Sequence, residues 1–195
     1  MKQNKLICLV GMPGAGKSEV ADYMRSKRDF GYFRFGQIVL DRVKESGQAG
    51  SEKQEREIRE NIRAEYGMAA MAILNLPKMQ ELLESNDVIG DGLYSWEEYL
   101  FLKEKFGDNL AIVAICAPPK VRYARLVGRA DRHQGDASLR YRSFTKEEVV
   151  ERDHAEIENS HKAGPIAMAD YIVINNCSIE ELYTQVDDAL TRIFE

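Results

Sequence analysis

Residues 6–18 read Leu6-Ile7-Cys8-Leu9-Val10-Gly11-Met12-Pro13-Gly14-Ala15-Gly16-Lys17-Ser18. The first five are apolar and predict a buried strand, and the next eight fit the spacing G-x-x-x-x-G-K-[ST] in full. A helical pattern follows from Lys17 to about Lys27. A strand, a glycine-rich turn and a helix in this order predict a phosphate-binding loop.

The residue types in this loop suit a nucleoside triphosphate. Glycines let backbone N–H groups surround phosphate oxygens, and the following helix presents its positive end to them. Lys17 is expected to reach the β- and γ-phosphates, and Ser18 to offer its hydroxyl to Mg²⁺. The residues expected at the nucleotide are Gly11, Met12, Pro13, Gly14, Ala15, Gly16, Lys17, Ser18 and the adjoining Glu19.

Length and composition limit the class of protein. The chain has 195 residues, 44% hydrophobic and 30% charged, with a formal net charge of −5, which predicts one globular domain and disfavours generic nucleic-acid binding. No apolar run is long enough to span a membrane, and no signal peptide is expected. Three widely spaced cysteines and three histidines without metal-ligand spacing predict a cytoplasmic protein without disulfides.

Apolar runs alternate with longer periodic stretches, which predicts an α/β domain with a parallel sheet. The expected strands are 6–10, 32–35, 88–91, 110–116 and 171–174. The expected helices include 17–27, 51–65, 68–76 and one from about 179 to 193, and Pro77 is expected to limit or kink the third of these.

Asp91 is the next candidate for the site, because it ends the short strand 88–91. Ligands of such sheets bind outside the carboxyl ends of the strands. We expect Asp91 to hold Mg²⁺ through water or to orient an acceptor hydroxyl. The alternative is a structural role, as the N-cap of the helix that follows near Ser95.

The segment from Lys120 to Lys146 is strongly basic in an otherwise acidic chain. Only Asp131 and Asp136 oppose its cations, and glycines at 128 and 135 suit a mobile loop. The cations are Lys120, Arg122, Arg125, Arg129, Arg132, Arg140, Arg142 and Lys146.

Two other classes of phosphate-loop protein fit poorly. A GTPase would need a guanine-reading Asn-Lys-x-Asp, which does not occur, and a motor ATPase would need a longer chain. A small-molecule kinase fits the length, the helical insertion after the second strand and the basic segment before the last strand.

Beyond the phosphate loop, several short motifs resemble those of the nucleoside monophosphate kinase and dephospho-CoA kinase superfamily. The chain is most similar to an adenylate-kinase-like group common in archaea, and the resemblance covers most of the chain. The motifs are Gly11–Ser18, 35–39 (Phe-Gly-Gln-Ile-Val), 76–78 (Leu-Pro-Lys), Asp91-Gly92 with Glu97-Glu98, 151–153 (Glu-Arg-Asp), and 169–176 (Ala-Asp-Tyr-Ile-Val-Ile-Asn-Asn).

The resemblance implies a three-layer P-loop NTPase fold with a mainly parallel sheet of five strands. It implies that residues 36–84 bind the acceptor and that 119–150 form a basic lid over ATP. Arg125, Arg129 and Arg132 would approach the transferred phosphate, and Asn175 with Asn176 would lie beside the adenine. The implied acceptor-binding residues are Arg34, Gly36, Arg42, Arg63, Gly92 and Tyr94.

Two positions depart from the family pattern. Adenylate kinases carry an arginine at the position of Leu40 in this chain. They carry a second arginine after the Asp-Gly pair, and the related archaeal group tends to have an arginine at the position of Tyr94. Arg34, Arg42, Arg59 or Arg63 could replace these arginines, or the acceptor could lack a phosphate at that place.

The sequence therefore predicts an ATP- and Mg²⁺-dependent kinase of a small metabolite, with a nucleotide or nucleotide-like acceptor. One alternative is an NTPase that acts as a conformational switch with a protein partner. A second is a protein that binds ATP and has lost phosphoryl transfer. The identity of the acceptor and the oligomeric state do not follow from the sequence.

Overall fold

The computed structural model describes residues 3–47, 52–127 and 144–195. Their strands form one parallel sheet in the order β2-β3-β1-β4-β5. This confirms the α/β fold with five strands and a parallel sheet. The strands are β1 (Leu6–Val10), β2 (Gly31–Arg34), β3 (Val88–Asp91), β4 (Leu110–Cys116) and β5 (Tyr171–Ile174).

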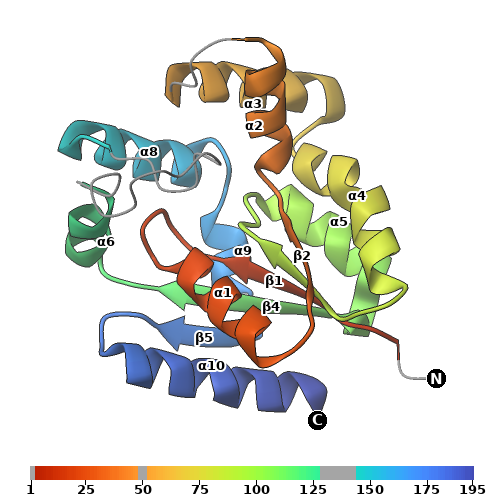
Figure 1. The fold of residues 1–195 in the computed structure, drawn as a ribbon. Coiled ribbons are helices and arrows are strands. Elements are labelled where there is room, and N and C mark those ends of the chain that lie inside the picture. The colour runs from red at the N-terminus through yellow and green to blue at the C-terminus, as the bar shows by residue number, and fades with distance from the viewer. Residues whose placement is uncertain (1–2, 48–51, 128–143) are drawn as a thin grey trace.

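Helices cover both faces of the sheet, so the molecule has three layers (Figure 1). On one face lie α1 (Lys17–Lys27) and α10 (Ile179–Phe194), and on the other α4 (Ala70–Leu83), α5 (Trp96–Phe106) and α9 (Ala163–Ala167). The remaining elements are α2 (Gln37–Glu45), α3 (Glu52–Tyr66), α6 (Pro119–Leu126), α8 (Lys146–Glu158) and the short turn η1 (Gly107–Asn109).

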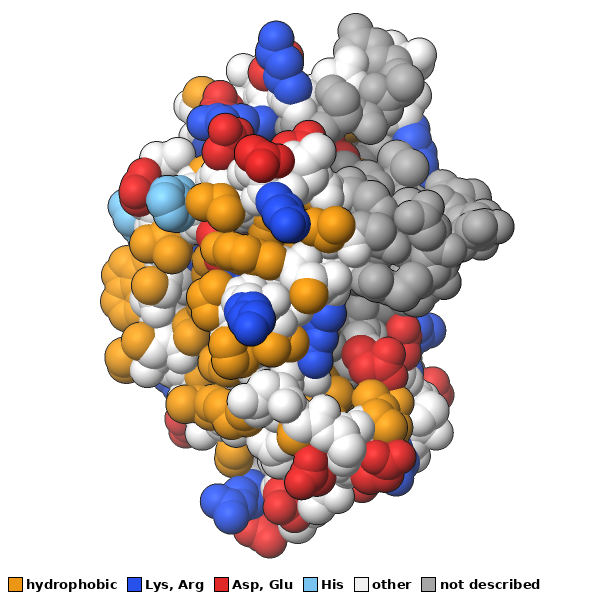
Figure 2. Space-filling model, turned by 90° about the vertical axis from the view of Figure 1, so that its left-hand side faces the viewer, with side chains coloured by type: hydrophobic (Ala, Val, Ile, Leu, Met, Phe, Trp, Pro, Cys, Tyr) orange, Lys and Arg blue, Asp and Glu red, His pale blue; other side chains and the backbone are white. Residues whose placement is uncertain are grey.

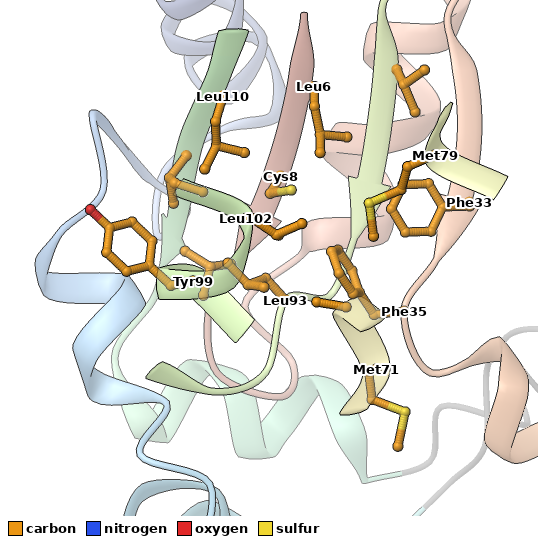
Figure 3. Close-up of a cluster of buried hydrophobic side chains, with 14 of the residues drawn as sticks. Leu6, Cys8, Phe33, Phe35, Met71, Met79, Leu93, Tyr99, Leu102 and Leu110 are labelled. Atoms are coloured by element: carbon orange, nitrogen blue, oxygen red, sulfur yellow. The ribbon is translucent and has the colours of Figure 1, made fainter. Parts of the chain in front are cut away.

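The central strands are buried on both sides, which explains their continuous apolar runs. All five residues of β1 are fully buried. Alternate residues supply two cores, and Figure 3 shows the one under α4 and α5, where Leu6, Cys8, Phe35 and Leu102 meet. These two cores fix the strand register that brings Asp91 level with Arg34 of β2 and with Leu9 of β1.

Of the two outcomes expected for Pro77, a limit to the preceding helix is wrong, and a kink stays a prediction. Helix α4 contains Pro77 and continues to Leu83. Met79, beyond the proline, is fully buried, and α4 packs against β2 and β3. This packing outweighs the backbone hydrogen bond that a proline removes from a helix.

Strand β5 is an edge of the sheet and carries exposed Ile172 and Ile174. The side chain of Gln185 covers part of this edge, since it accepts from Ile174 N at 2.8 Å and donates to Ile174 O at 3.0 Å. Figure 2 shows hydrophobic side chains across the middle of one face, with charged ones above and below. Among the described residues, no helix is both long and apolar enough to cross a membrane.

Candidate active site

The phosphate loop lies between β1 and α1, at the carboxyl edge of the sheet, with α2 and α3 on one side of this edge and α6 and α8 on the other (Figure 1). Gly14 has φ +77° and Gly16 has φ +103°. A Cβ on Gly14 would lie 2.6 Å from the carbonyl oxygen of Arg122, and one on Gly16 would lie 2.1 Å from Nδ2 of Asn175. Both positions therefore need glycine for conformation and for space.

No side chain caps the start of α1, whose N-cap is Gly16. Such a helix end binds anions through its backbone N–H groups and the helix dipole. Lys17 Nζ donates to the loop's own carbonyl oxygens, at 2.8 Å to Gly11 and 3.4 Å to Met12. Burial lowers the pKa of Lys17 to about 7, and the nearby charge of Lys162 adds to this effect, while Asp91 and Glu156 oppose it.

A cavity of about 430 Å³ opens in front of this loop. Its walls come from four parts of the chain: the phosphate loop with α1, the ends of β2 and β3, helices α2 to α4, and α6 with α8 and the start of α10. Among the described residues of the lining, six basic side chains stand against three carboxylates. The cations are Lys17, Arg34, Arg59, Arg63, Arg125 and Arg152, and the carboxylates are Glu19, Glu55 and Asp91.

Asp91 lies in this cavity at the carboxyl end of β3, 6% exposed. Tyr32 donates its hydroxyl to Asp91 Oδ2 at 3.1 Å, which orients the carboxylate. The alternative role as a helix cap does not hold, because Ser95 caps α5, with its Oγ accepting from Glu98 N at 3.0 Å. Asp91 and Ser18 line one cavity, and a serine hydroxyl with a carboxylate acting through water suits Mg²⁺.

Asn175 connects the end of β5 to the phosphate loop. It is 6% exposed, its Nδ2 donates to Ala15 O at 2.8 Å, and its Oδ1 accepts from Arg125 Nη2 at 3.1 Å. Both polar atoms of its side chain therefore bind protein groups, one in the phosphate loop and one on Arg125. Asn176 does not line the cavity and instead borders a shallow hollow beside the start of α10.

The acceptor residues expected from the sequence separate into two groups. Arg34, Gly36, Arg63, Gly92 and Tyr94 line the cavity, as does Leu40, whereas Arg42 does not. A Cβ on Gly36 would lie 3.0 Å from the Tyr94 hydroxyl oxygen, so Tyr94 packs directly over this glycine. The expected lid residues Arg129 and Arg132 lie outside the described residues.

Three site residues were missed from the sequence: Arg152 of α8, Lys162 and Glu55. Arg152 lines the cavity, and its Nε donates to Glu156 at 3.0 Å. Glu156 also pairs with buried Lys162, whose ammonium lies 4.6 Å from the Tyr94 ring centre. The motif at 151–153 was the available signal for Arg152, while nothing in the local sequence marks Lys162 as a neighbour of Lys17.

The fold and this cavity define a P-loop protein of the kinase-like type. The chain belongs to the UPF0200 family: it is 33% identical to UPF0200 protein PF1294 of Pyrococcus furiosus, over 97% of this chain and 98% of that protein. The AAA domain family model matches residues 7–151.

Solved structures share this fold at low sequence identity. TT1252 from Thermus thermophilus superposes with a TM-score of 0.63 at 18% identity, covering 98% of both chains. Shikimate kinase from Bacteroides thetaiotaomicron superposes with a TM-score of 0.58 at 16% identity, covering 98% of this chain and 99% of that one.

Proposed function

We propose that this protein transfers the γ-phosphoryl group of ATP, in the presence of Mg²⁺, to a hydroxyl group of a small metabolite, with a nucleotide or nucleotide-like acceptor. One observation carries the proposal: a single cavity is lined by the phosphate loop, by Asp91 and by a second wall from α2, α3 and α4. A nucleotide switch needs no second wall for a small acceptor. The kinase-like fold of the structural neighbours supports the same class of reaction.

The reaction would join the acceptor oxygen to the γ-phosphorus while the bond from the γ-phosphorus to the β,γ-bridging oxygen breaks, and ADP leaves. Negative charge spreads over the phosphoryl oxygens in such a transition state, so catalysis depends on positioned cations. Lys17, Arg125 and Arg152 line the cavity on the side of the phosphate loop, α6 and α8. They would neutralise this charge once Lys17 turns from its own loop carbonyls to the phosphates.

Asp91 would accept a hydrogen bond from the acceptor hydroxyl and take its proton as the new P–O bond forms. Its hydrogen bond from Tyr32 leaves the other carboxylate oxygen for this contact. Mg²⁺, held by Ser18 and through water by Asp91, would supply positive charge to the phosphates. The wall formed by residues 36–84 would bind the rest of the acceptor.

An acceptor screen tests the proposal. ADP release from Mg²⁺-ATP would be measured alone and with nucleoside monophosphates, dephospho-CoA and other pantetheine compounds, shikimate and gluconate. We expect at least one of these compounds to raise ADP release more than about tenfold, with a phosphorylated product identified by mass spectrometry. Rapid ADP release that no acceptor changes would contradict the kinase proposal and favour the switch, and Lys17→Ala is the control for contaminating ATPases.

A further inference from the structure

Three arginines line the cavity on the side away from the phosphate loop. Arg34 is the last residue of β2. Arg59 and Arg63 are four residues apart on α3 and therefore lie on the same face of that helix. All three line the cavity. None belongs to the elements that hold the triphosphate.

Carboxyl groups of α3 and α5 interact with two of these arginines. Glu55 of α3 also lines the cavity, and its Oε2 lies 3.7 Å from Arg59 Nη1. Arg63 Nη1 donates to the neutral hydroxyl of Ser160 at 3.0 Å. Arg63 also interacts with buried Glu98, but burial raises the pKa of Glu98 to about 7, so that this carboxyl carries only part of a charge near neutrality.

Arg63 has a donor that the protein does not use. Its Nε is buried and has no hydrogen-bond acceptor among the described residues. An unsatisfied buried donor is unfavourable, and a guanidinium matches an oxyanion with two parallel hydrogen bonds.

Apolar side chains line the same cavity as these arginines. They are Val39, Leu40 and Met71, and all three are nearly fully buried. Apolar walls exclude water, which strengthens charge-assisted hydrogen bonds within them. Such walls also suit a ligand whose anionic group adjoins a less polar body.

We propose that Arg59 and Arg63, with Arg34, form an oxyanion site that binds an anionic group of the phosphoryl acceptor, a phosphate monoester or a carboxylate distant from the reacting hydroxyl. That the bound anion belongs to a phosphoryl acceptor rests on the proposed function. The oxyanion site itself does not require catalysis. It replaces, with arginines from α3, the two family arginines absent at Leu40 and Tyr94.

Direct binding tests the site without catalysis. With the phosphate loop saturated by Mg²⁺ and a non-hydrolysable ATP analogue, orthophosphate and acetate would be titrated by calorimetry. We expect Arg59→Gln and Arg63→Gln each to weaken binding of the preferred anion about 10- to 100-fold, the range for a hydrogen bond to a charged group. The control is Arg56→Gln, on the same helix but exposed and paired with Glu60, which should bind as the wild type does. Unchanged binding in both cavity variants would overturn the site.

Kinetics then separate the two proposals. Matched acceptors with and without the anion would be compared: gluconate with glucose and, where the product carries the new phosphate on a hydroxyl group, AMP with adenosine. We expect Arg59→Gln and Arg63→Gln to raise the KM of the anionic acceptor and leave the KM of ATP unchanged. A phosphate acceptor should lose affinity below about pH 6, where its second proton binds, and a carboxylate should not. Equal use of charged and uncharged acceptors would overturn the oxyanion site and support the kinase proposal. Anion binding without any acceptor-dependent ADP release would support the oxyanion site and overturn the kinase proposal.

Discussion

Arg122 of α6 and Asp153 of α8 form a buried bidentate ion pair, with Nη1 to Oδ1 at 2.8 Å and Nη2 to Oδ2 at 2.6 Å. Arg122 also donates to Pro13 O of the phosphate loop at 3.1 Å. Tyr123 adds a hydrogen bond to the same carboxylate at 3.0 Å. One guanidinium thus connects the loop to the two helices on one side of the cavity.

Removing one partner of this pair should be costly. Asp153→Asn leaves the Arg122 charge buried without its counter-ion, and we expect a loss of about 3–5 kcal/mol in the free energy of unfolding, measured by urea denaturation. The double variant Arg122→Met, Asp153→Leu should recover much of this loss. Glu60→Gln, which breaks an exposed pair with Arg56, should change stability by less than about 1 kcal/mol. Similar small effects in Asp153→Asn and Glu60→Gln would show that the buried pair does not brace the loop.

The strands and the phosphate loop were predictable because their signals are local. Continuous apolar runs mark strands that are buried on both faces, and the loop needs glycines at fixed spacing. Asp91 followed from the same rule, since it ends a strand beside β1. The basic segment from Lys120 to Lys146 remains a prediction as a lid, because residues 128–143 lie outside those described.

The rest of the site depends on how distant segments return to the cavity. Lys162 lies between α8 and α9, far from Lys17 in the sequence, and no periodicity predicts that its charge reaches Lys17. From the sequence, Arg42 and Arg59 were equally good candidates for the acceptor site. Where α2 packs against α3, Arg59 lines the cavity and Arg42 does not. Pro77 was misinterpreted for the same reason, since burial beyond it decides where the helix ends.

Lys17→Ala should abolish most activity and leave the fold intact. Its ammonium would follow the migrating phosphoryl group, so we expect kcat to fall at least about 10²–10³-fold, as for the loss of one transition-state donor. Since burial disfavours the charged form, removing the amine should not lower the melting temperature. Wild-type kcat in this variant would refute the assigned role, and an unfolded variant would contradict the expectation for the fold.

The lowered pKa of Lys17 predicts proton uptake when a nucleotide binds. In the free protein the amine is mostly neutral at about pH 8, because its pKa is about 7. Phosphates favour the ammonium and raise this pKa, so binding of a non-hydrolysable ATP analogue with Mg²⁺ should take up close to one proton at about pH 8 and very little at about pH 5.5. Calorimetry in buffers of different ionisation enthalpy measures this number. Lys17→Arg, which stays charged, should show none of this uptake, and equal uptake by both proteins would assign the proton elsewhere.

Asp91→Asn should separate catalysis from ATP binding. The amide keeps the size of the side chain and loses the charge that would accept the hydroxyl proton, so we expect kcat to fall at least about 10²-fold, within the range for a general base. The Kd of the ATP analogue should change little. Tyr32→Phe removes only the orienting hydrogen bond and should lower kcat far less. If Asp91→Asn lowers the melting temperature and retains activity, the carboxylate has a structural role.

Glu98 should make stability depend on pH. Its Oε2 accepts from the backbone N–H groups of Tyr94 and Ser95 at the start of α5, and burial raises the pKa of the carboxyl from 4.5 to about 7. The folded state therefore binds more protons than the unfolded state between these pH values, so this contribution to stability is complete below about pH 4.5 and is lost as the pH rises to about 7. Glu98→Gln retains an acceptor for both N–H groups and cannot ionise. Relative to the wild type, we expect it to gain on the order of 1–3 kcal/mol in the free energy of unfolding on going from about pH 5 to about pH 8.

The control is Glu104→Gln, exposed on the same helix, whose stability should follow the wild type at every pH. Urea denaturation across this range gives the comparison, and a constant difference between Glu98→Gln and the wild type would show that Glu98 does not titrate in this window.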